Sequence, residues 1–171
     1  AAGGLAAALD RFDNLAISFS GAEDVVLVDM AAKLGKPFRV FTLDTGRLHS
    51  ETYRYLEKVR THYGIKLEVI FKDAAATEKL ASEKGLFSFY VEDHKECCAI
   101  RKVGPLRRKL STLSAWVTGQ RKDQSPGTRT AVPVVQLDRT FGTPERPLLK
   151  FNPLSEWSSK QVWDYIRQHD V

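Results

Sequence analysis

The sequence contains little cysteine and no long apolar run. Its 171 residues include two cysteines, Cys97 and Cys98, which are neighbours in the chain. Adjacent cysteines close a strained ring when they bond to each other, and such sparse cysteine is typical of a reducing compartment. No apolar stretch approaches the roughly 20 residues that cross a bilayer, and the Ala-rich start lacks the pattern of a secretory signal. We therefore expect a soluble protein of the cytoplasm or an organelle stroma, with no membrane partner.

Two common nucleotide-binding motifs are also missing. The segment "SFSGAED" (18–24) has neither the lysine of a Walker A loop nor the G-x-G-x-x-G pattern of dinucleotide-binding proteins. The net charge is +5, with cations gathered in 95–109 and at Arg121, Lys122 and Arg129, which indicates an anionic partner. Because no aromatics alternate with these cations to stack bases, we favour a small phosphorylated or sulfated ligand over nucleic acid.

Short β-rich segments alternate with amphipathic helical patterns. This alternation predicts right-handed βαβ units, and hence a Rossmann-like α/β fold with a mainly parallel sheet flanked by helices. The length favours one domain, residues 1–171. The expected strands are 15–20, 38–44, 66–71, 115–120 and 132–137; the expected helices are 22–35, 49–64, the cysteine segment and 158–170, with 140–147 as a surface loop.

Three of the predicted strands end in segments rich in Gly, Ser and Thr: "SFSGAED", "LDTGR" and "TGQRKDQSPGTR". In open α/β sheets, ligands bind at the carboxyl ends of strands, and such residues permit close backbone approach to an anion. Each segment has a structural alternative, because Ser20-Gly21 can simply cap a helix and Asp44 can cap the segment after it. For Asp44 we favour contact with a ligand hydroxyl or amine. Arg129 is either a bidentate clamp on phosphate or sulfate, or part of a solvated loop.

The cysteine pair stands in "HKECCAIRKVGPLRRKL" (94–110). If residues 96–103 are helical, Cys97 shares a face with Arg101, and Cys98 shares one with Lys102. A cation above each thiol would stabilise a thiolate or offset the charge of a thiolate-bound metal cluster. Two buried apolar cysteines are the alternative, but the polar neighbours favour a functional role. Pro105 is expected to break or kink the helix.

Six segments, in their order along the chain, carry a resemblance to a known family: "SFSGAEDVVL", "LDTGRLHSETY", "KGLFSFY", "ECCAIRKVGPLRR", "GQRKDQSPGTR" and "FNPLSEWSSKQVWDYIR". From Phe12 to Val171 the sequence resembles assimilatory adenylyl sulfate (APS) reductases of the PAPS/APS reductase family. These are PP-loop proteins with the adenine nucleotide alpha-hydrolase-like fold. The adjacent cysteines resemble those of the iron–sulfur type, whereas the related 3′-phosphoadenylyl sulfate (PAPS) reductases typically lack them.

The resemblance implies a set of site residues. Those that would lie near the substrate are Ser18, Phe19, Ser20 and Gly21 in the PP-loop, Leu43, Asp44, Thr45 and Gly46 beside the adenosine, and Gly119 and Arg129 in the covering loop. Cys97 and Cys98 match two ligands of a [4Fe-4S] cluster, and Lys102 matches the lysine that links the cluster to the substrate sulfate. The family's second cysteine pair and its nucleophilic cysteine are absent from these residues and are expected beyond Val171.

The implied activity is thiol-dependent reduction of APS to sulfite and AMP in sulfate assimilation. The missing thiolate would attack the sulfur of APS, forming an enzyme S-sulfocysteine, and a thioredoxin- or glutaredoxin-like thiol would release sulfite. We expect residues 1–171 alone to bind APS or AMP without turnover. The expected compartment is bacterial cytoplasm or plastid stroma. The resemblance is compatible with a homo-oligomer. The alternatives are a PAPS reductase, a PP-loop ATP pyrophosphatase or adenylating enzyme, and a non-catalytic nucleotide-binding module. The ATP-using enzymes have an SGGxDS loop. In this sequence Ala22 and Glu23 replace the second glycine of that loop and the residue after it. The extra carboxylate, Glu23, is expected to repel a terminal phosphate.

Overall fold

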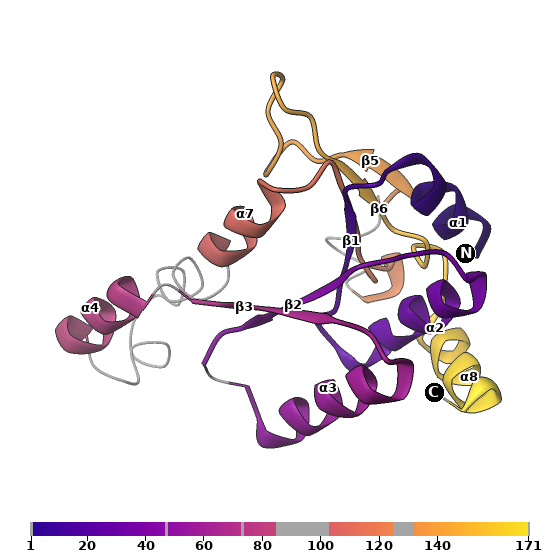
Figure 1. Ribbon diagram of the computed structural model, residues 1–171, viewed down its shortest axis with the longest axis horizontal. Helices are drawn as coiled ribbons and strands as arrows, with labels where there is room; N and C mark the ends of the chain where they lie inside the picture. The colour runs from indigo at the N-terminus through magenta and orange to yellow at the C-terminus, as the bar shows by residue number, and fades with distance from the viewer. Residues whose placement is uncertain (1, 47, 73, 85–102, 125–131, 171) are drawn as a thin grey trace.

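A six-stranded sheet forms the centre of the computed structural model, which describes residues 2–46, 48–72, 74–84, 103–124 and 132–170 (Figure 1). The strand order is β3-β2-β1-β4-β6-β5, and every neighbouring pair is parallel except β5 and β6. The predicted mainly parallel α/β fold is therefore confirmed. The strands are β1 (Leu15–Ser18), β2 (Val40–Asp44), β3 (Leu67–Phe71), β4 (Ala115–Val117), β5 (Val135–Leu137) and β6 (Leu149–Phe151).

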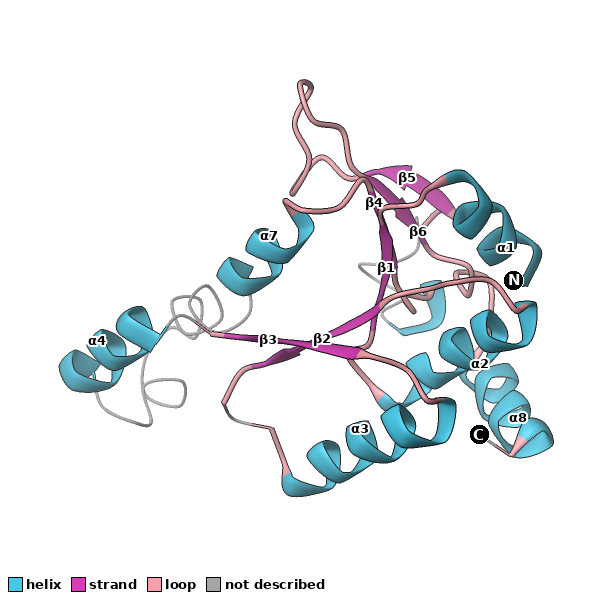
Figure 2. Ribbon diagram, viewed as in Figure 1, coloured by secondary structure: helices cyan, strands magenta, loops and turns pink. Residues whose placement is uncertain are grey.

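Helices cover both faces of the sheet (Figure 2). The larger core cluster joins one face to α1, α2, α3 and α8, and a smaller one around Phe41 and Trp116 joins the other face to α7. These helices, with α4, are α1 (Ala2–Arg11), α2 (Val25–Leu34), α3 (Ser50–Tyr63), α4 (Ala74–Lys84), α7 (Gly104–Leu110) and α8 (Ser159–His169). Short 3₁₀ turns precede α2 and follow β4: η1 (Ala22–Asp24) and η3 (Lys122–Gln124).

The ends of the principal helices follow from local sequence. Gly35 and Gly64 adopt left-handed conformations with φ of 69° and 59° where α2 and α3 end, as the sequence predicted for both helices. Ser158 caps α8, because its side chain accepts a hydrogen bond from the Gln161 amide and the Gln161 side chain accepts one from the Ser158 amide. α2 is buried from Val25 through Ala31, since it lies between the sheet and other helices.

Several elements differ from the sequence-based expectation. β6 was missed, because three residues between a loop and a turn are too few to show a strand period. α1 and α4 were not predicted. Each predicted strand is longer than the observed one by one to three residues, at the C-terminal end for β1 and β4 and at the N-terminal end for β2, β3 and β5. The surface loop at 140–147 is confirmed as turns and bends. Pro105 lies in the first turn of α7, where its missing N–H costs little, and the predicted helix before residue 103 falls outside the described residues.

Within the described ranges, none of the helices is long and apolar enough to cross a membrane.

Candidate nucleotide site

A cavity of about 650 Å³ opens at the carboxyl ends of β1, β2 and β4. The strand order explains its position, because β1 lies between β2 and β4 and the chain leaves β1 toward one side and returns later on the other. The connections diverge at such a switch point and leave a crevice between them, which is where ligands bind in open α/β sheets.

The structure brings most of the predicted site residues of the described ranges to this cavity. Those that line it are Ser18, Phe19, Ser20, Gly21, Leu43, Thr45 and Gly119. Asp44 instead lines a neighbouring pocket of about 250 Å³ between β3 and α3. Lys102, Arg129, Cys97 and Cys98 lie outside the described residues. The convergence of the three strand-end segments is thus visible, whereas the roles of the single residues stay predictions.

The described cavity wall is largely apolar and carries no lysine or arginine. Phe19, Leu43 and Leu56 supply apolar surface, and Thr45 and Thr118 also line the cavity. The Thr118 hydroxyl is engaged within the protein, because it donates to Asn152 Oδ1 and accepts from the Gln120 amide. The charged residues that line the cavity are Asp24 and Glu51. Among the described residues, no lysine or arginine lines it. The wall therefore suits a nucleoside better than a phosphate chain, which would need cations supplied from elsewhere.

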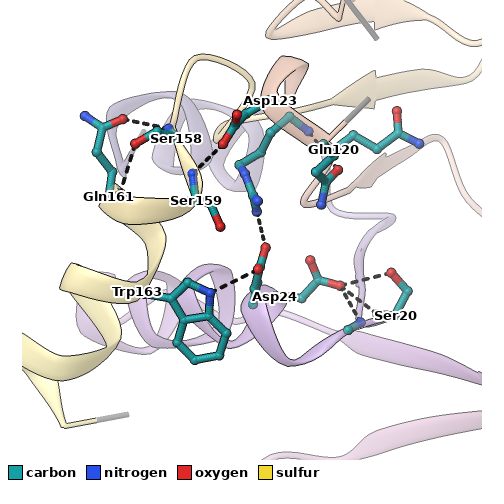
Figure 3. Close-up of polar contacts among 12 residues, drawn as sticks. Ser20, Asp24, Gln120, Asp123, Ser158, Ser159, Gln161 and Trp163 are labelled. Carbon is teal, nitrogen blue, oxygen red and sulfur yellow. Dashed lines mark hydrogen bonds and ion pairs between the residues drawn. The ribbon is translucent and has the colours of Figure 1, made fainter. Parts of the chain in front are cut away.

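Asp24 holds the loop that follows β1 (Figure 3). Its Oδ2 atom accepts hydrogen bonds from the Ser20 amide at 2.7 Å, the Gly21 amide at 3.0 Å and the Ser20 hydroxyl at 3.1 Å. Burial raises the pKa of Asp24, and these three hydrogen bonds oppose that rise. Sequence reasoning missed this residue, although a carboxylate three positions after Gly21 is the pattern of a helix cap.

Gly119 is pressed against the same carboxylate. A Cβ atom built on Gly119 would lie 1.9 Å from Asp24 Oδ1, so a larger residue does not fit unless Asp24 moves. The sequence singled out Gly119 as part of a ligand-covering loop, and the structure adds a second reason for glycine, which is close packing between the segments after β1 and β4.

Glu23 is not the free carboxylate that the sequence suggested. It forms an ion pair with Arg121, and its Oε1 accepts a hydrogen bond from Trp163 Nε1 at 3.2 Å (Figure 3). Its charge is therefore offset, which corrects the expectation that it repels a terminal phosphate. The sequence placed Arg121 among the cations that indicate an anionic partner. In the structure Arg121 is only 3% exposed. A pairing across 98 residues leaves no signal in local spacing.

Asp44 closes a turn at the end of β2. Its Oδ1 atom accepts a hydrogen bond from the Gly46 amide at 2.8 Å and one from the Tyr53 hydroxyl at 2.7 Å. The hydrogen bond to Asp44 raises the pKa of Tyr53. Gly46 has φ of 75°, a conformation that favours glycine. These contacts give Asp44 the turn-forming part of its two predicted roles, and ligand contact stays a prediction.

Among the described residues, no group of three His, Cys, Asp or Glu side chains could hold a metal ion.

Comparisons with known proteins give consistent matches. Residues 14–171 match the family model of the phosphoadenosine phosphosulfate reductase domain. The chain is 61% identical over 168 residues to an adenosine 5′-phosphosulfate reductase of Pseudomonas aeruginosa, covering 98% of this chain and 63% of that protein. It is 54% identical over 168 residues to the chloroplastic 5′-adenylylsulfate reductase 3 of Arabidopsis thaliana, covering 96% of this chain and 37% of that one. The chain thus spans less than two thirds of these relatives.

A solved structure shares the fold. The phosphoadenylyl-sulfate reductase of Candida auris, in a phosphate complex, superimposes with a TM-score of 0.82 at 28% identity, covering 99% of this chain and 79% of that one. This likeness confirms the predicted adenine nucleotide alpha-hydrolase-like fold.

Proposed function

The chain belongs to the phosphoadenosine phosphosulfate reductase family, and from that premise we propose that it is the nucleotide-binding domain of an oxidoreductase that reduces APS to sulfite and AMP. The observation that carries the proposal is the convergence of the segments after β1, β2 and β4 on one cavity at the switch point of the sheet. Relatives named for this reaction, at 61% and 54% identity, support it.

The described cavity supports recognition of the adenosine half of APS. An adenine ring would meet apolar wall residues such as Phe19 and Leu43, and the ribose hydroxyls would meet Thr45. The phosphosulfate needs positive charge, which we assign to Lys102 and Arg129 as the resemblance implies. Both residues lie outside the described ranges.

The proposed chemistry needs a nucleophilic thiolate from outside these 171 residues. That thiolate would attack the sulfur of APS, the bond from sulfur to the phosphate oxygen would break, and AMP would leave with the electron pair. A thioredoxin- or glutaredoxin-like dithiol would then reduce the enzyme S-sulfocysteine and release sulfite. Such thiol chemistry fits a reducing compartment, which we take to be bacterial cytoplasm or plastid stroma.

The cysteine content does not complete an iron–sulfur site. A [4Fe-4S] cluster takes four thiolates, and the chain has two cysteines. We propose that Cys97 and Cys98 supply two ligands and that the others come from outside these residues. The test is iron analysis and visible absorbance of the longer protein, wild type against Cys97→Ser. Equal iron in both forms would contradict a ligand role for Cys97.

The loop after β1 favours APS over the ATP-using alternative. The amides of Ser20 and Gly21 donate to Asp24, so they are engaged before any phosphate arrives. A triphosphate would have to displace a buried carboxylate and would also face its charge. Likewise, no lysine or arginine of the described ranges lines the cavity, so the described wall offers nothing that attracts the additional 3′-phosphate of PAPS.

Calorimetric titration of the chain with APS, PAPS and Mg-ATP tests the proposal. We expect APS to bind most tightly. Ala22 is exposed and lines the cavity, so Ala22→Trp should block binding without a buried clash. The matched control is Ala75→Trp at an exposed position of α4, which should bind like wild type. Tighter binding of PAPS would favour the PAPS reductase alternative, and tighter binding of Mg-ATP would favour the ATP enzymes.

A further inference from the structure

Two consecutive carboxylates of η1 reach across the crevice to the segment that follows β4. Asp24 packs against Gly119, as described above. Glu23 forms an ion pair with Arg121 Nη1, and the Arg121 side chain is 4% exposed. The loop after β1 and the segment 119–121 are therefore joined at two successive positions, and both of these segments line the cavity.

The same cluster includes the start and middle of α8. Trp163 Nε1 donates to Glu23 Oε1, and the Ser159 amide donates to Asp123 Oδ2 at 2.6 Å (Figure 3). α8 thus contacts both the turn after the PP-loop and the segment after β4. Glu23 links all three elements, because one of its carboxylate oxygens meets Arg121 and the other meets Trp163.

The charge of Arg121 makes this contact costly to lose. Within the described residues, Arg121 Nε is buried and has no hydrogen-bond partner, so Glu23 is the carboxylate that compensates the guanidinium. Removing one partner of a buried ion pair leaves an uncompensated charge. The guanidinium would then move toward water, and Gly119 and Gln120, which precede it and line the cavity, would move with it.

We propose that Glu23 is a positioning residue of the nucleotide site: through Arg121 it holds the segment after β4 in the arrangement that binds the nucleotide. The inference rests on the proposed nucleotide-binding function. It assigns to Glu23 no contact with the ligand, and it links the docking of α8 to nucleotide affinity, because Trp163 and Arg121 share one carboxylate.

The test compares Glu23→Gln with Glu156→Gln. Glu156 pairs with Lys122 in the same segment, but its side chain is 68% exposed, so it is a matched control for loss of an ion pair. We expect Glu23→Gln to raise amide hydrogen exchange of residues 119–122 and to weaken AMP binding, each by about tenfold. Glu156→Gln should stay within about twofold of wild type in both measurements.

The outcomes separate positioning from general stabilisation. If Glu23→Gln lowers the thermal midpoint but leaves the AMP dissociation constant unchanged, Glu23 is only structural and the proposal is wrong. If Glu23→Gln does not fold, Glu23→Asp keeps the negative charge but shortens the side chain that reaches Arg121. Unchanged AMP affinity and hydrogen exchange in Glu23→Asp would overturn the proposal, and a partial loss of both would support it. Wild type that binds no AMP or APS would overturn the proposed function, and hydrogen exchange alone would then decide whether Glu23 orders the segment.

Discussion

Replacing Gly119 by alanine tests how tightly the two cavity loops are packed. The new Cβ atom would lie 1.9 Å from Asp24 Oδ1, well inside the roughly 3.5 Å contact distance of non-bonded heavy atoms. Gly119 has no left-handed φ, so backbone strain does not enter. Asp24 must therefore move by more than an ångström, and its other oxygen then loses hydrogen bonds from Ser20 and Gly21.

The magnitude follows from those bonds. A hydrogen bond to a charged group contributes about 1.5–3 kcal/mol, and the displaced carboxylate recovers part of the loss by reaching water. We expect Gly119→Ala to lower the free energy of unfolding by about 2–4 kcal/mol. Gly3→Ala is the matched control, since nothing lies within 4 Å of its added Cβ and it lies in α1; it should be neutral or stabilising.

Urea unfolding of four proteins measures the effect: wild type, Gly119→Ala, Asp24→Ala and the double variant. If the clash with Asp24 is the cause, alanine at 119 should cost less than about 0.5 kcal/mol once Asp24 is truncated. Equal costs in both backgrounds would refute the reasoning, because the penalty would then come from something other than the carboxylate.

Two further predictions concern the helices on either face of the sheet. Burial alone would raise the pKa of Asp29, but hydrogen bonds from a lysine and two tyrosines lower it, so its stabilisation is present at neutral pH and is lost as pH falls below about 4. Tyr165→Phe should shrink the acid-sensitive part of the unfolding free energy, and a curve parallel to wild type from about pH 2 to 7 would argue against this. On the other face, Lys109 is 9% exposed and lies 2.5 Å from Glu68, so Lys109→Met should cost about 1–3 kcal/mol in urea unfolding. Lys160→Met, which breaks a well-exposed pair, should cost less than about 0.5 kcal/mol, and equal losses would contradict the role of burial.

The sequence was sufficient for the parts of the fold that repeat a local pattern. Buried β-rich runs such as Leu15–Ser18 and the glycines that end α2 and α3 give signals within a few residues. Once the strands are parallel, their carboxyl ends meet at one edge, so the gathering of "SFSGAED", "LDTGR" and "TGQ" at one cavity follows from topology. β6 lacked such a signal, since Leu149–Phe151 becomes a strand only by pairing with β4 and β5.

The contacts inside the site could not be predicted in the same way. A cluster of cations in the sequence indicates an anionic partner only if the side chains reach the surface, and Arg121 does not. Its partner Glu23 is 98 residues away, and the reason for glycine at 119 is a carboxylate on another loop. Local spacing carries no information about such pairs, because they form when the sheet brings the segments after β1 and β4 together.

The pair Glu23-Asp24 also bears on how this loop differs from one that binds polyphosphate. A free helix N-terminus attracts an anion through unpaired amides. Here the carboxylate of Asp24 already accepts hydrogen bonds from the amides of Ser20 and Gly21. Glu23 forms its ion pair with Arg121 and does not line the cavity. The loop is thereby ordered without a ligand, and its backbone contributes little that is new to an incoming phosphate. Anion recognition in this site must then come from side-chain cations of other segments, which is the role that we assign to Lys102 and Arg129.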